Sequence, residues 1–201
     1  GAPGTEAARV RTGRGPAVVG AVVVVAAMGA ETATAQYLGG GRKSSAEAQI
    51  ADLEQLAEKF VALAGAFPDE QWDWRPMEGV RSVRDVLALI ATEPTLFPTM
   101  WGFDAPSWVP VPQIGAELER NRSLSPDDTL EEIRRAFGHV VEVARGLEET
   151  DRRRSVPFFG LQVPVETAIT LMANDMHEHL GQLIAYARMN GIVPPWSRSG
   201  S

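Results

Sequence analysis

One stretch of this 201-residue chain decides its fold: Asn174-Asp-Met-His-Glu-His-Leu-Gly-Gln-Leu-Ile-Ala-Tyr-Ala-Arg188. Its apolar residues recur with helical spacing, and Asp175 and His179 are four residues apart, so they share one face of the predicted helix. A carboxylate and an imidazole on one face can bind the same divalent metal ion. His177 lies about 200° round the helix from His179. We expect it, and His139 on another segment, to be solvated.

The second unusual residue is Glu93. It interrupts an apolar helical line formed by Val86, Ile90, Phe97 and Met100. A carboxylate that faces a core is costly unless it is paired or binds a cation. With Asp175 and His179 it would supply three metal ligands from two helices. Two alternatives stay open: a kink at Pro94 turns Glu93 outward to solvent, or His179 is a core histidine whose ring Asp175 orients.

Four segments of the chain have helical periodicity. Their apolar stripes span residues 50–67, 83–100, 130–147 and 169–187, and no stretch alternates as a strand does. We expect Ser82 to cap the second helix, Asp128 or Thr129 to cap the third, and the fourth to begin near Pro164. Four such helices predict an all-α fold, a four-helix bundle.

The second helix and the connection after it contain several prolines. Pro94 and Pro98 lie inside the second apolar stripe, so we expect that helix to kink or break. Residues 101–127 form the one long connection and contain Trp101 and Trp108. We expect this connection to cross one end of the bundle and to line a pocket there.

The first 35 residues are predicted to be a secretory signal peptide. Arg9, Arg11 and Arg14 precede an apolar run at residues 17–30, and Ala33-Thr-Ala35 has the small-x-small pattern of a cleavage site. The run is shorter than the roughly 20 residues of a membrane span, although an uncleaved anchor stays open. We therefore expect an exported protein, periplasmic or extracellular, that is not in the membrane after cleavage. Residues 36–44 are a predicted flexible linker, 45–196 the bundle and 197–201 a tail.

Composition excludes several classes of function. The net charge is −7 with a pI near 5.0, which argues against a nucleic-acid surface. The chain has no cysteine, so a thiol nucleophile, a disulfide framework and a cysteine-bound zinc are excluded. Gly-rich phosphate loops, Gly-x-Ser-x-Gly elbows and His-Glu-x-x-His motifs are also missing from the sequence.

Residues 45–196 resemble the DinB-like superfamily of metal-binding four-helix bundles. The matching pieces are Trp74-Arg-Pro76, Arg81-Ser-Val-Arg-Asp-Val-Leu-Ala-Leu-Ile-Ala91 and Glu178-His-Leu-Gly-Gln-Leu-Ile-Ala-Tyr-Ala-Arg-Met-Asn-Gly-Ile-Val-Pro-Pro-Trp196. The resemblance implies a divalent metal held by three histidines, and the matching positions here are Leu89, Asp175 and His179. Only His179 is a histidine; Asp175 offers a carboxylate, and Glu93, one turn beyond Leu89, can compensate.

Three functions remain open from the sequence. The first is an exported metal-dependent hydrolase or transferase that holds one divalent ion, zinc or nickel, at a remodelled site and acts on a small-molecule substrate. The second is a metal-free module on the same scaffold that binds a small molecule or a partner. The third is a structural bundle, and a homodimer is compatible with any of them.

Overall fold

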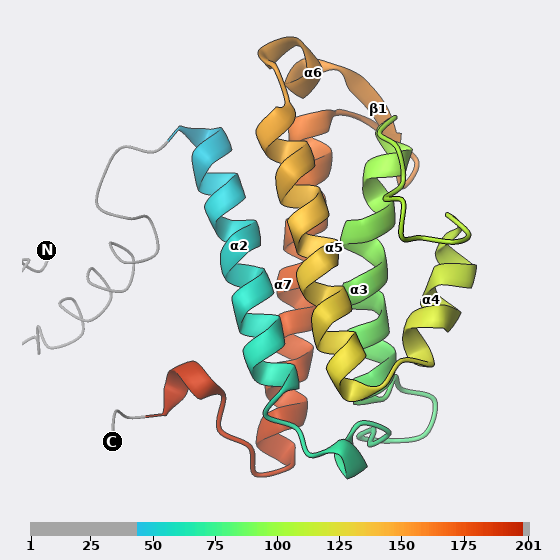
Figure 1. The fold of residues 1–201 in the computed structure, drawn as a ribbon. Helices are drawn as coiled ribbons and strands as arrows, with labels where there is room; N and C mark the ends of the chain where they lie inside the picture. The colour runs from blue at the N-terminus through green and yellow to red at the C-terminus, as the bar shows by residue number, and fades with distance from the viewer. Residues whose placement is uncertain (1–43, 199–201) are drawn as a thin grey trace, which may run out of the picture. The chain divides into compact units, whose positions relative to one another are not determined.

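The computed structural model describes residues 44–198, and four long helices dominate them (Figure 1). They are α2 (Ser45–Ala64), α3 (Val83–Met100), α5 (Pro126–Gly146) and α7 (Val165–Met189). The shorter elements are η1 (Asp69–Gln71), α4 (Ile114–Arg122), α6 (Glu149–Arg153), β1 (Ser155–Phe158), β2 (Leu161–Pro164) and η2 (Pro195–Ser197). The predicted helical bundle is confirmed. The predicted signal peptide and all but the last residue of the predicted linker lie outside the described residues.

Serine side chains begin three of the long helices. The hydroxyls of Ser44, Ser82 and Ser125 each accept a hydrogen bond from the backbone N–H three residues further on. Such a bond satisfies one of the donors that a helix leaves free at its start. The prediction of Ser82 as a cap is confirmed. The prediction of Asp128 or Thr129 is wrong, because the Asp128 N–H is itself the donor to Ser125, at 3.2 Å.

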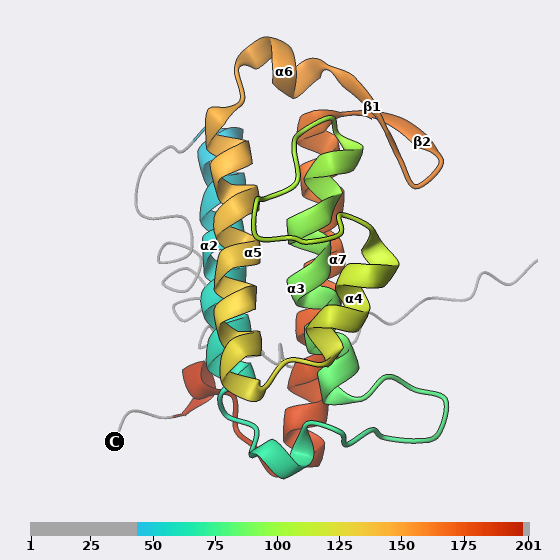
Figure 2. The same cartoon turned by 45° about the vertical axis from the view of Figure 1, so that its right-hand side comes forward.

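The order of the helices around the bundle differs from their order in the chain. Both α2 and α3 pack beside α5 and α7, so α2 and α3 lie at opposite corners, as do α5 and α7 (Figures 1 and 2). The neighbours α3 and α5 run in the same direction, and the connection between them must therefore return along the bundle. It carries α4, which packs against α3. The prediction that residues 101–127 cross one end is wrong, because that connection runs beside α3 instead.

Helix α3 is buried along most of its length and continues through both of its prolines. The sequence predicted a kink or a break at Pro94 or Pro98, and the break is therefore wrong. Three other helices pack on α3, and this packing outweighs the loss of two backbone donors. The hydroxyls of Thr92 and Thr95 also donate to carbonyl oxygens one turn back, at 2.7 and 2.8 Å.

A β-hairpin joins α6 to α7. Strands β1 and β2 pair antiparallel with a two-residue loop between them, so the prediction that no stretch forms a strand is wrong. Pro157 and Pro164 argued against a strand in the sequence, because proline lacks the backbone donor that a β-ladder needs. Both prolines are tolerated because each strand of a two-stranded hairpin is an edge strand. The hairpin lies beside the upper ends of α3 and α7 (Figure 2). Helix α7 begins directly after Pro164, as predicted.

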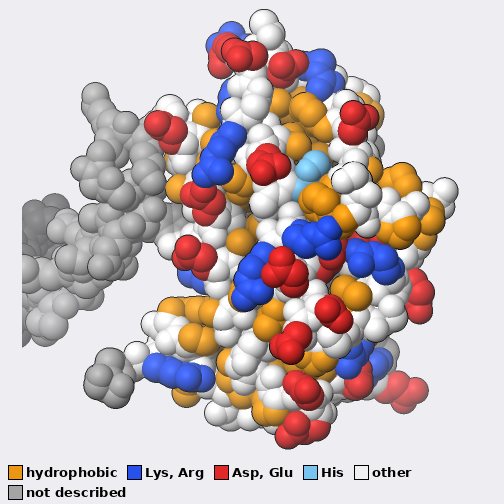
Figure 3. Space-filling view, viewed as in Figure 1, with side chains coloured by type: hydrophobic (Ala, Val, Ile, Leu, Met, Phe, Trp, Pro, Cys, Tyr) orange, Lys and Arg blue, Asp and Glu red, His pale blue; other side chains and the backbone are white. Residues whose placement is uncertain are grey.

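The surface of the described part is mixed in character. On the face in Figure 3, side chains of both charge signs alternate, with apolar areas between them. Among residues 44–198, no helix combines the length and the hydropathy that a bilayer crossing needs.

Candidate metal centre

Three predicted ligands come together in the structure. Each of Glu93, Asp175 and His179 offers one ligand atom, and these atoms all lie within 4.8 Å of one another. Glu93 comes from α3, and the other two come from successive turns of α7. Because α3 and α7 run in opposite directions side by side, Glu93 lies level with that pair. The alternative in which Pro94 turns Glu93 outward to solvent is wrong.

Hydrogen bonds on α7 orient the imidazole of His179. Its Nδ1 lies 3.4 Å from Oε1 of Gln182, whose Nε2 donates to the Tyr186 hydroxyl at 2.9 Å. That hydroxyl donates to the carbonyl oxygen of Arg81 at 3.0 Å. Since a carbonyl only accepts, the direction of every bond in the chain follows, and His179 carries its proton on Nδ1. Its Nε2 faces Asp175, whose Oδ2 is 3.7 Å away.

Sequence reasoning did not identify Gln182 and Tyr186 as parts of the site. Both follow His179 on the same helix, at spacings of three and seven residues, which place them on its face. Histidines that bind metals commonly donate their second N–H to such a partner. That spacing is the signal that could have revealed them.

The electrostatics of the cluster favour a cation. Burial, and then the neighbouring carboxylate of Asp175, raise the pKa of Glu93 to about 9, while Arg81 lowers it. One oxygen of Glu93, Oε2, is buried without a hydrogen-bond partner in the described part. A buried acceptor without a donor is costly, and the pair of carboxylates can relieve its repulsion only through a proton or a cation. Two carboxylates and one imidazole whose Nε2 faces them therefore fit a divalent metal ion.

The cluster faces a cavity of about 510 Å³. Helix α3 lines it with Leu89, Glu93 and Phe97, and α7 lines it with Leu171, Met172, Asp175 and His179. Arg81 and the hairpin residues Phe158, Phe159 and Leu161 complete the lining. The carboxylates and the imidazole therefore lie in a largely apolar hollow, which is the usual setting of a small-molecule site.

The two remaining histidines lie outside this cavity. His177 is partly exposed as predicted, and its Nε2 lies 3.0 Å from Asp52 on α2. The prediction of a solvated His139 is wrong, because its ring packs edge-on to Trp108, with 6.1 Å between centroids. Burial lowers the pKa of His139, although Glu142 raises it. Neither histidine belongs to the metal cluster.

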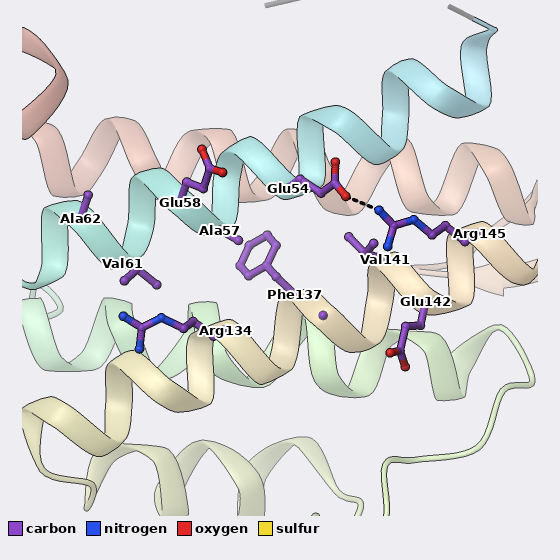
Figure 4. A pocket seen from close by; sticks show the side chains of 11 residues that line it. Glu54, Ala57, Glu58, Val61, Ala62, Arg134, Phe137, Val141, Glu142 and Arg145 are labelled. Carbon is purple, nitrogen blue, oxygen red and sulfur yellow. Dashed lines mark hydrogen bonds and ion pairs between the residues drawn. The ribbon is translucent and has the colours of Figure 1, made fainter.

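A second hollow, of about 590 Å³, lies between α2 and α5 (Figure 4). Its floor is apolar, with Phe137 and Val141, and an ion pair between Glu54 and Arg145 crosses its rim. No histidine lines this hollow in the described part of the chain. We therefore place the chemistry in the smaller cavity.

Comparison with known proteins agrees with this fold. A family model described as the DinB superfamily matches residues 52–183. A search of curated proteins found no match.

Several solved structures have the same fold. A DinB-like protein from Bacillus cereus has a TM-score of 0.58 at 16% identity, over 72% of this chain and 94% of that one. YfiT from Bacillus subtilis, described as a probable metal-dependent hydrolase with an unusual four-helix bundle topology, has a TM-score of 0.57 at 20% identity, over 75% and 91%. A mycothiol-dependent maleylpyruvate isomerase has a TM-score of 0.55 at 14% identity, over 70% of this chain and 61% of the isomerase. At these identities the likeness concerns the fold.

Proposed function

The chain belongs to the DinB superfamily, and from this premise we propose that it is an exported enzyme, a hydrolase or transferase, that depends on a divalent metal. The observation that carries the proposal is the cluster of Glu93, Asp175 and His179 within 4.8 Å. YfiT, which has the same fold, is described as a probable metal-dependent hydrolase. This supports the class of reaction but names no substrate.

The ligands in this proposal are one imidazole nitrogen and two carboxylate oxygens. Zinc and nickel both accept such a mixture. When bound, the ion supplies Lewis acidity, which polarises a carbonyl or phosphoryl oxygen of a substrate. Three protein ligands leave coordination positions open toward the cavity, as catalytic sites require.

The surrounding residues prepare the site for binding. Gln182, held by Tyr186, fixes the ring of His179 so that Nε2 faces the carboxylates. Glu93 carries a proton at neutral pH in the metal-free protein because its pKa is raised to about 9. Metal binding must therefore release that proton, and the affinity for metal rises with pH.

One observation favours the metal-free alternative. Leu89, the position that matches a family histidine, lines the cavity with an apolar side chain. A protein that had lost its metal could keep the cavity as a binding site for a small molecule. The two functions differ in whether the protein binds a metal ion at His179.

Metal content of the chain, purified without a histidine tag, tests the proposal. We expect about one zinc or nickel ion per chain, lost in His179→Ala and retained in His177→Ala. The second variant is a matched control because His177 lies on the same helix but pairs with Asp52. Equal metal binding by both variants would place the site elsewhere, and no binding by the unaltered protein would favour the metal-free module.

Export is a separate part of the proposal. The basic, apolar and small-residue order within residues 1–35 supports it. We expect the mature chain to begin at Gln36, and N-terminal sequencing of protein from the culture medium or the periplasm measures this directly. A mature chain that retains residues 17–30 would support the uncleaved anchor instead.

A further inference from the structure

The hairpin loop holds an aromatic residue in an unfavourable conformation. Phe159 has φ 46° and is followed by Gly160 with φ 80°; among the described residues it is the one non-glycine residue with positive φ. Positive φ at both positions is the mark of a tight two-residue loop that prefers Asn-Gly. Phe159 is also 69% exposed. A strained and exposed aromatic residue at a site points to a function.

Phe159 lies at the opening of the cavity that Glu93, Asp175 and His179 face. Its ring contacts Phe158 and Phe97 edge-on, with centroids 4.6 and 5.4 Å away. Leu161 and Leu171 line the same end of the cavity. This end therefore offers an apolar surface made of aromatic rings and leucines, partly open to solvent.

The opposite end of the cavity has a positive charge. Arg81 is the only arginine or lysine that lines it within the described part of the chain. Its carbonyl oxygen is fixed by Tyr186. Its guanidinium lowers the pKa of Glu93 through its charge but forms no hydrogen bond or ion pair with the residues described. A guanidinium with free donors is suited to a carboxylate or another anionic group.

The rise of helix α3 gives a measure of the length of the cavity. Leu89, Glu93 and Phe97 lie on successive turns, and eight residues of helix rise about 12 Å. Arg81 precedes the helix and lies beyond Leu89. Along the chain, Glu93 lies between Arg81 and Phe97, and the charge of Arg81 is near enough to lower the pKa of Glu93.

We propose that the cavity binds an elongated small molecule with an apolar end, aromatic or alkyl, against Phe159 and an anionic end at Arg81. The bond to be altered then lies beside Glu93, Asp175 and His179. The substrate class is thus an aryl or alkyl carboxylate or a similar anionic amphiphile. Only the position of the reacting bond rests on the proposed function; the two binding ends do not.

Calorimetric titration with phenylhexanoate and with its neutral amide tests this inference. We expect the carboxylate to bind more tightly, and Arg81→Gln to weaken it about tenfold while leaving the amide unchanged, as for the loss of a charge-assisted hydrogen bond. Phe159→Asn should weaken both probes about fivefold without lowering Tm, because Asn-Gly suits the loop. Met77→Asn, at another exposed apolar loop residue, is the control and should change nothing.

The probe titrations are made once in the presence of a chelator and once with zinc. A separate titration with zinc alone measures whether the protein binds the ion. If zinc does not bind but the two variants act as expected, the proposed function fails and this inference stands. If zinc binds but neither variant alters binding of the probes, the inference alone is overturned. It is also overturned if the unaltered protein binds neither probe, or prefers the amide.

Discussion

Two pairs of carboxylates in this protein have their negative charge balanced in different ways. Between α4 and α5, Glu117 and Glu132 are 1% and 4% exposed, and the guanidinium of Arg120 bridges them. In the cavity, Glu93 and Asp175 lie together with an imidazole, and no guanidinium forms an ion pair with either in the described structure. The first pair is neutralised by hydrogen-bonded ion pairs with the protein itself. The second has the proton on Glu93 and the more distant charge of Arg81, which forms no ion pair with either carboxylate in the described residues.

The difference indicates that the pair of Glu117 and Glu132 is structural. Arg120 donates to both carboxylates, and its hydrogen bond with Glu117 raises the pKa of the guanidinium, so that it stays charged. Arg135 and the indole N–H of Trp108 also reach Glu132, at 3.4 and 3.1 Å. This network attaches α4 to α5. The cavity pair lacks such partners, and a divalent cation would replace the proton there.

Removal of the bridging guanidinium should have the largest effect. Arg120→Met leaves two carboxylates buried against each other, and we expect a loss of about 3 kcal/mol in the free energy of unfolding. Urea denaturation measures it. Zinc affinity should not change, because α4 does not contribute to the cavity.

The control for Arg120→Met is a variant that also carries Glu117→Gln. If the loss comes from the unpaired charges, this second change restores part of the stability. A loss of the same size in both proteins would show that the arginine acts through packing and not through charge.

Removal of the two α7 ligands tests the other pair. Zinc at a hundredfold excess over its Kd should stabilise the unaltered protein by about 2.7 kcal/mol, since it binds only the native state. In Asp175→Ala with His179→Ala, zinc should produce no shift of Tm. Thermal unfolding with and without zinc measures both. A shift that persists in the double variant would contradict the site, and His177→Ala should retain the full shift.

The pH dependence of the metal-free protein should reveal the proton on Glu93. The folded pKa of about 9 lies above the ordinary value of 4.5, so the folded state binds more protons between these values. Stability in chelator should therefore fall as pH rises from 4.5 toward 9. Even one unit of pKa difference corresponds to about 1.4 kcal/mol.

Glu93→Gln removes this titration and should flatten the pH profile over that window. Denaturation midpoints in chelator at several pH values compare the two proteins. A profile that falls equally steeply in both would assign the effect to another group. With saturating zinc, the stability of the unaltered protein should no longer fall as pH rises, because the ion replaces the proton.

Local patterns in the sequence identified the residues of one carboxylate pair but not those of the other. Asp175 and His179 could be found because a spacing of four puts them on one helix face, and Glu93 because it interrupts an apolar line. The network of Glu117 and Glu132 was missed, since its residues come from two separate segments and one of them was interpreted as a loop. Contacts between distant segments depend on the order of the helices around the bundle, which no local pattern contains.

The hairpin was missed for a different reason. Its strands contain two prolines, and its loop has Phe159 where asparagine is usual. Both departures lower the local signal for a hairpin. The predictions of a signal peptide and of export concern residues outside the described ones and stay predictions.

The smallest effect is expected for a change at Trp108. This change tests whether Glu132 depends on a neutral donor as well as on the guanidiniums. Trp108→Phe removes one neutral donor to Glu132, but Arg120 and Arg135 still reach that carboxylate. We expect a loss of about 1 kcal/mol, the usual net value of one hydrogen bond, measured by urea denaturation. A carboxylate that guanidiniums already neutralise should tolerate the loss of an uncharged partner. A loss as large as that of Arg120→Met would mean that Glu132 depends on the indole, and that the two carboxylate pairs differ less than their ion pairs indicate.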